Sequence, residues 1–158
     1  MNCPLLRTLA TLPIFGYAVD ARLRRSGFEL KSLFAEWRIP EAGALMHTFD
    51  AAGKPLFDAQ KPVPTIIRGV YVEAGYDVFH PFRLKHQLVP FARLEHYNTQ
   101  AAVPEGFTAN PTHSIREYTF GASYRPVREV VVKADYQLRN RKAGPHETQV
   151  NFGVGFMY

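Results

Sequence analysis

The sequence predicts an all-β protein, an antiparallel up-and-down transmembrane β-barrel to which this chain contributes about seven strands. Three observations support this prediction. Apolar and polar residues alternate with a period of two, the breaks between alternating segments are short and long in turn, and the face opposite the apolar one is rich in charge. A period of two is typical of strands, and a strand needs only about 9–11 residues to cross a membrane.

The alternating segments follow one another along most of the chain. In the last of them, Val150, Phe152 and Val154 share one face. Gln149 and Asn151 share the other. Because successive side chains of a strand point to opposite faces, each such segment is predicted as a strand. The predicted strands cover residues 15–24, 28–38, 69–79, 90–98, 117–125, 129–142 and 147–158.

The sequence divides into an irregular N-terminal segment, residues 1–13, and the strands of the barrel, residues 14–158. Pro4 and Pro13 disfavour a strand in the first segment. Arg7 interrupts the apolar core that a signal peptide needs. Bacterial single-chain barrels have even strand numbers, so about seven strands lead us to expect the C-terminal part of a larger barrel.

The connections between the predicted strands alternate in length. A transmembrane barrel has this rhythm because tight turns lie at one mouth and longer loops at the other. Aromatic residues such as Phe28, Tyr76 and Tyr124 stand near strand ends, as interfacial girdles require. The shorter breaks are 25–27, 80–86 and 125–128, and the longer ones, rich in Pro, Gly, Ala and Asn, are 40–65, 98–113 and 140–147.

The charged face predicts which side chains line the interior. A small soluble barrel fills its interior with apolar side chains, whereas a face this charged must see water. Lipid outside and water inside satisfy both faces, so Phe120, Ala122, Tyr136, Val154 and Phe156 are predicted to face lipid. The predicted pore-lining residues are Arg22, Lys31, Glu73, Asp77, Arg93, Glu95, Glu117, Lys133, Asp135, Gln137 and Arg139.

An alternative interpretation of the alternating pattern stays open. Alternation by itself also describes an antiparallel sheet with one face in water. The alternative is therefore a soluble β-barrel or sandwich module that binds a small ligand. Dependence on detergent separates the two hypotheses.

Composition excludes several classes of protein. The 158 residues, 46% hydrophobic and 21% charged, fit one globular domain and exclude disorder and collagen-like fibres. Cys3 is the only cysteine, so the sequence predicts neither a disulfide framework nor a cysteine-based zinc site. The net charge is +5, but basic residues are interleaved with acidic ones, which disfavours nucleic acid as a partner.

Motifs that carry chemistry are largely missing from the sequence. It contains no Gly-rich phosphate loop, no HExxH and no nucleophile elbow, so we expect no enzyme and no cofactor. An outer-membrane esterase or protease would need a serine beside a histidine, and no sequence context places one there. His80 and His86 are the pair that could meet around one turn, where ordinary surface histidines are the favoured interpretation over a metal site.

Four segments carry a resemblance to a known family. The ending VNFGVGFMY resembles the C-terminal assembly signal of bacterial outer-membrane barrels. TFGASYRPVREVVVKADYQ, RGVYVEAGYDVF and LVPFARLEHYNTQAAVPEGF resemble strands of porins related to the phosphate-selective porin O/P group. The resemblance spans residues 14–158 and is most specific in about the last ninety residues.

The resemblance implies a function and partners. It implies a Gram-negative outer-membrane porin of about sixteen or more strands, often a homotrimer, with a water-filled channel for passive diffusion of small hydrophilic solutes, anions among them. Its partners would be outer-membrane lipid and lipopolysaccharide, the remaining barrel strands and the barrel-insertion machinery. That machinery would recognise Val154, Phe156 and the terminal Tyr158.

Selectivity is only weakly encoded in the sequence. The predicted interior charges are nearly balanced, so they give little preference for anions or cations. The segment Arg139, Asn140, Arg141 and Lys142 gathers positive charge at the mouth predicted to be extracellular. It either draws anions inward or contacts lipopolysaccharide phosphates.

Overall fold

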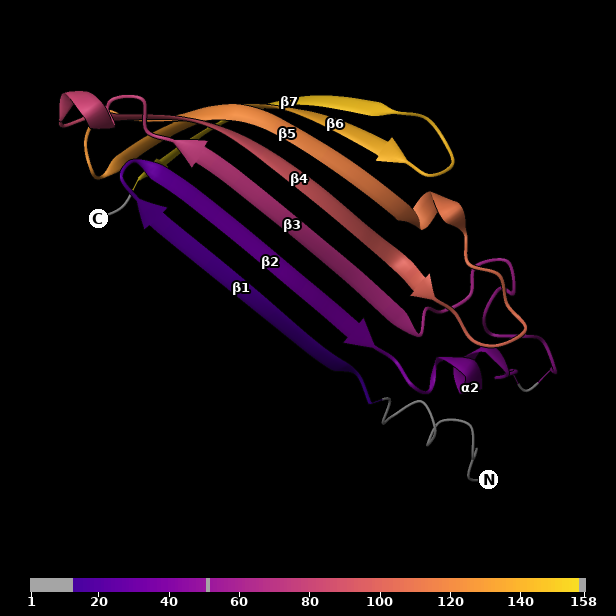
Figure 1. The fold of residues 1–158 in the computed structure, drawn as a ribbon. Helices are drawn as coiled ribbons and strands as arrows, with labels where there is room; N and C mark the ends of the chain where they lie inside the picture. Colours follow the sequence, from indigo (N-terminus) through magenta and orange to yellow (C-terminus); the bar gives the residue numbers. More distant parts are fainter. Residues whose placement is uncertain (1–12, 51, 157–158) are drawn as a thin grey trace.

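A single antiparallel sheet makes up the fold in the computed structural model, which describes residues 13–50 and 52–156. The strands run up and down and pair in chain order, with a seven-stranded sheet ordered β1-β2-β3-β4-β5-β6-β7 (Figure 1). The predicted all-β, antiparallel, up-and-down arrangement is confirmed. The strands are β1 Phe15–Arg25, β2 Phe28–Arg38, β3 Ile66–Tyr76, β4 Gln87–Ala102, β5 Ser114–Arg125, β6 Val130–Arg141 and β7 Glu147–Phe156.

β3, β4 and β5 each begin three residues earlier than the sequence predicts, and the ends of β3 and β4 also differ from the prediction. β3 ends at Tyr76 instead of residue 79, because the Asp77 carboxylate accepts hydrogen bonds from the backbone N–H groups of Phe79 and Leu88 and closes a turn. β4 runs to Ala102 instead of residue 98. The end of β4 consists of polar residues and alanines, and the sequence prediction therefore assigned it to a loop.

The connections at the two ends of the sheet differ in kind. Residues 26–27, 77–86 and 126–129 lie at one end, and β7 also ends there, since Phe156 pairs with Val130 (Figure 1). We call this the turn end, and the opposite end the loop end. The tightest turn holds Ser26 and Gly27 at φ 49° and 83°, as a two-residue hairpin turn of the primed type requires.

The loop end carries connections 39–65, 103–113 and 142–146. The first contains the helix α2, Ala42–Met46, which buries Ala42 and Met46. The buried Gln100 side chain ties two of these connections together, because its amide donates to the Pro62 carbonyl and accepts from the Asn110 N–H at 2.9 Å each. The loop end is therefore an ordered cluster. The 142–146 connection is nevertheless shorter than 77–86, so the predicted alternation of lengths is a tendency rather than a rule.

The sheet has no second layer in the part of the chain that the structure describes. It curls, with β1 and β7 as unpaired edges, and neither face is covered by a helix or another sheet (Figure 1). The buried apolar side chains among these residues are Ala42, Met46, Val89 and Ile115, with Pro62 and Pro104 in the loop-end connections. No helix within residues 13–50 and 52–156 is long and apolar enough to cross a membrane. A conventional hydrophobic core is therefore missing from this region.

Candidate functional site

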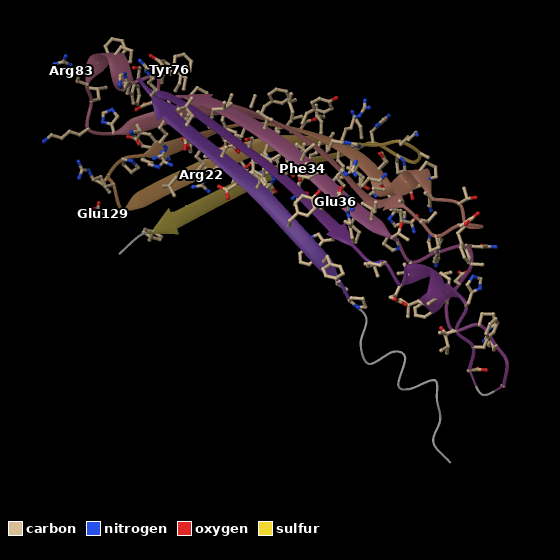
Figure 2. All side chains as sticks on the ribbon, turned by 60° about the horizontal axis from the view of Figure 1, so that its bottom comes forward. Arg22, Phe34, Glu36, Tyr76, Arg83 and Glu129 are labelled. Atoms are coloured by element: carbon tan, nitrogen blue, oxygen red, sulfur yellow. The ribbon has the colours of Figure 1, made fainter. Side chains whose placement is uncertain are left out.

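The polar face of the sheet is the candidate functional site. Strand pairing places side chains of matching register on one face, and Figure 2 shows Arg22 on the side of β1 that faces β7. The residues predicted to line a pore, except Asp77, come together on this face: Arg22, Lys31, Glu73, Arg93, Glu95, Glu117, Lys133, Asp135, Gln137 and Arg139.

A first group of ion pairs crosses β1, β2 and β3. Arg24 Nη2 lies 2.6 Å from Glu29 Oε1, and Lys31 Nζ lies 2.8 Å from Glu73 Oε1. Lys31 is also 3.5 Å from Glu29, which joins the two pairs. The Glu29 and Glu73 side chains keep only 13% and 15% of their exposure, because the charged neighbours pack side by side. These four side chains therefore form one connected network across β1, β2 and β3.

Arg93 forms a separate ion pair on β4. Its Nη2 lies 2.6 Å from Glu95 Oε2, and its guanidinium stacks 3.9 Å from the centre of the Tyr71 ring. Cation–π stacking and the ion pair hold the guanidinium flat against the sheet. Glu73 is its register partner on β3.

A second group lies across β5, β6 and β7 near the loop end. Arg139 Nε is 2.9 Å from Glu117 Oε2, and its Nη1 is 3.4 Å from Glu147 Oε2. Arg141 adds a further contact of 3.0 Å to Glu147. Two basic and two acidic side chains therefore neutralise one another here.

Between the second group and the turn end, β6 places Lys133 and Asp135 on the same face, 3.4 Å apart. Asn151 donates to Asp135 at 2.9 Å from β7, and the Lys133 ammonium lies 4.6 Å from the centre of the Phe91 ring. Phe91 in turn fills the space above Gly121, where a Cβ would meet its ring at 2.8 Å. The Lys133 side chain remains 46% exposed, so it is the more accessible charge of this pair.

Asp77 differs from the other predicted pore-lining residues. It lies beyond the end of β3 and is 8% exposed. Its carboxylate accepts hydrogen bonds from the backbone N–H of Phe79 in the 77–86 turn and from that of Leu88 at the start of β4. Asp77 therefore stabilises this turn and is not on the strand where the sequence placed it.

The opposite face is apolar and exposed. Phe152 is 83% exposed, and every strand contributes at least one large apolar side chain of this kind. Val154 and Phe156 lie on this face, whereas Tyr158 is outside the described residues. At the turn end, Phe28 and Tyr76 stack with ring centres 4.6 Å apart. Trp37 of β2 is also exposed but alternates with Glu29 and Lys31 and therefore lies on the polar face. The exposed large apolar residues on the apolar face are Phe15, Tyr17, Val19, Leu23, Phe28, Leu30, Val70, Val72, Leu94, Phe120, Tyr124, Val132, Tyr136, Val150, Phe152, Val154 and Phe156.

Charged and polar side chains also lie on the apolar face near the loop end, and the sequence did not predict them. Glu36 is 1% exposed and pairs with Arg38 at 2.7 Å and Arg68 at 2.6 Å. Arg116 and His96 are register partners on the same face. The missed signal is their numbering, because all of them continue the apolar alternation of their own strand. Glu36, Arg68, His96 and Arg116 lie two residues from an apolar position, and Arg38 lies four residues beyond Phe34.

His96 also lies beside a serine, which the sequence did not lead us to expect. Its Nε2 is 3.3 Å from Ser114 Oγ. In the described residues no carboxylate is hydrogen-bonded to His96, so the third member of a catalytic triad is missing there. Nor does any group of three or more His, Cys, Asp or Glu within these residues come close enough to hold a metal ion. His86 instead packs its ring 4.8 Å from that of Phe79.

Comparison with known proteins shows that half of this chain is similar to part of a longer protein. An uncharacterized protein of Aquifex aeolicus (strain VF5) is 33% identical over 79 residues, which are 50% of this chain but 18% of the relative. The relative is therefore about 440 residues long, and this chain matches a small part of it. No known family and no solved structure matches the chain.

Proposed function

We propose that this chain forms part of the wall of an outer-membrane β-barrel whose water-filled channel allows passive diffusion of small hydrophilic solutes, anions among them. One observation carries the proposal. A single sheet exposes an apolar face on one side and an ion-paired face on the other, with no second layer over the described strands. The proposed location is the outer membrane of a Gram-negative bacterium.

The apolar face supports a lipid environment. Soluble monomers rarely expose apolar patches larger than a few hundred Å², and here all the strands contribute to one such face. Hydrocarbon removes the cost of that exposure, and strand pairing satisfies the backbone groups that lipid cannot. The Phe28–Tyr76 pair would form part of the aromatic girdle at the turn end.

The polar face supports a water-filled interior. Charges that leave water lose more hydration energy than ion pairing returns unless every group is well partnered. Arg22, which has no ion-pair partner among the described residues, adds positive charge to a wall that is otherwise nearly neutral. This excess favours anions weakly over cations.

The open sheet implies further strands. Eight strands leave an interior just wide enough for side chains, whereas sixteen to eighteen leave an aqueous channel. The edges β1 and β7 are the places where such strands would pair. A protein of about 440 residues, like the Aquifex relative, is long enough to supply them. Lipid, lipopolysaccharide and the insertion machinery are the further partners that this proposal requires, and a homotrimer is the assembly common among the porins that the sequence resembles.

Fractionation of cells tests the proposal. We expect the protein in the outer-membrane fraction of a sucrose gradient, resistant to alkaline carbonate and released by detergent. A periplasmic soluble protein followed in the same gradient is the control. A protein that stays in the supernatant as a monodisperse species without detergent would instead support the soluble ligand-binding module.

A further inference from the structure

A row of polar residues borders the apolar face at the loop end. His96, Arg116 and Asn140 are register partners across β4, β5 and β6. The next row toward the middle of the sheet includes Leu94 and Tyr118. Two residues along a strand span about 7 Å, so this polar row lies one step beyond the apolar band.

The positive charge of this row is unbalanced. Farther along the same rim, Arg38 and Arg68 are both ion-paired, since they share the carboxylate of Glu36. Arg116 and Lys142 form no ion pair with any residue in the ranges 13–50 and 52–156. The cations of the rim are therefore unpaired over β5 and β6, whereas over β2 and β3 they are held by a carboxylate.

The unpaired cations surround a hollow of about 470 Å³. Its lining offers hydrogen-bond donors of several kinds: the Arg116 guanidinium, the Lys142 ammonium, the Asn140 amide and the Ser114 hydroxyl, with His96 at 3.3 Å from that hydroxyl. Such donors match the oxygens of a phosphate group, which accepts hydrogen bonds and carries negative charge.

We propose that this hollow binds the phosphate group of a lipid headgroup, with the acyl chains lying on the adjacent apolar band. The inference rests on the proposed function, since it requires the apolar face to lie in a membrane. A lipid is favoured over free phosphate because the hollow lies beside exposed apolar side chains such as Leu94, which is 56% exposed. Basic clusters next to a membrane-spanning region recognise anionic headgroups in this way.

Native mass spectrometry of protein extracted from outer membranes in neutral detergent tests the site. The probes are lipid A with two phosphates, the same lipid after phosphatase treatment, and inorganic phosphate as a competitor. We expect the bisphosphorylated lipid to bind at least tenfold more tightly than the treated one. Inorganic phosphate at millimolar concentration should displace less than half of it.

The variants locate the site on the protein. Arg116→Gln combined with Lys142→Gln should lose at least tenfold in affinity, whereas Arg116→Lys should keep most of the affinity. Arg128→Gln removes an exposed arginine at the turn end and should change nothing. The same shift in gel mobility between unheated and heated samples in every variant verifies that each folds as the unmodified protein does.

Each outcome has a definite meaning. Equal binding by the double variant and the unmodified protein, or equal loss in Arg128→Gln, overturns this site and leaves the barrel proposal standing. Complete displacement by inorganic phosphate overturns the lipid as the occupant. A protein missing from outer membranes overturns both proposals, and the fractionation experiment detects this before any lipid is added.

Discussion

Phe152→Arg is expected to abolish assembly of the protein in the outer membrane, whereas Gly153→Arg, one residue away, is expected to be tolerated. Phe152 lies on the apolar face of β7 with 83% of its surface exposed. An arginine on the lipid face near the bilayer midplane costs about 2–4 kcal/mol, which corresponds to a thirty- to seven-hundred-fold loss of folded protein.

Gly153 is a matched control because it points to the polar face. A Cβ there meets no atom within 4 Å, so an added side chain has space. Folded protein in outer membranes is measured by the gel mobility of unheated samples, and total protein by heated ones. Equal amounts of folded protein from the two variants would contradict the assignment of the apolar face to lipid.

The 158-residue chain on its own is expected to give no steady channel in a planar bilayer. Its sheet is open, and seven strands cannot enclose a water-filled space. A version with enough further strands to close the barrel should give uniform conductance steps. Uniform steps from the short chain itself would refute the proposal that additional strands complete the wall.

In the closed version, Lys133→Glu should move the reversal potential under a salt gradient toward cation preference. Lys133 is half exposed on the polar face, so its charge acts directly on ions in the lumen. Lys85→Glu makes the same charge change in the exposed 77–86 connection and should have a smaller effect. An unchanged potential in Lys133→Glu would remove this residue from the channel wall.

Much of the sheet was predictable because a period of two encodes strand and face together. The alternation of Val150, Phe152 and Val154 against Gln149 and Asn151 needs no knowledge of distant residues. The end of β3 was not predictable in this way. Asp77 continues the alternation, and only the spatial proximity of Leu88 turns its carboxylate into a turn-forming group.

The sequence predicted which charged residues lie on the polar face but not which of them contact one another. Sequence reasoning placed Lys31 and Glu73 on one face, yet the 2.8 Å contact between them depends on the register of β2 against β3. The same limit hid Glu36, whose burial results from Arg38 and Arg68 converging on it. Contacts between side chains of two strands depend on the register of those strands. The alternation within one strand carries no information about that register.

The central claim is that one face of the sheet contacts lipid and the other contacts water. Tyr136 and Gln137 are neighbours on β6 with opposite orientations. In a Cys3→Ser background, Tyr136→Cys and Gln137→Cys provide single thiols on the two faces. A membrane-impermeant, charged thiol reagent applied to isolated outer membranes reports which thiol meets water.

This labelling experiment is the most direct test. Labelling after unfolding in urea measures the total amount of each thiol and normalises the two variants. The account predicts that Gln137→Cys is labelled in intact membranes and that Tyr136→Cys is labelled only after unfolding. Equal labelling of the two thiols, or labelling of Tyr136→Cys alone, would contradict it.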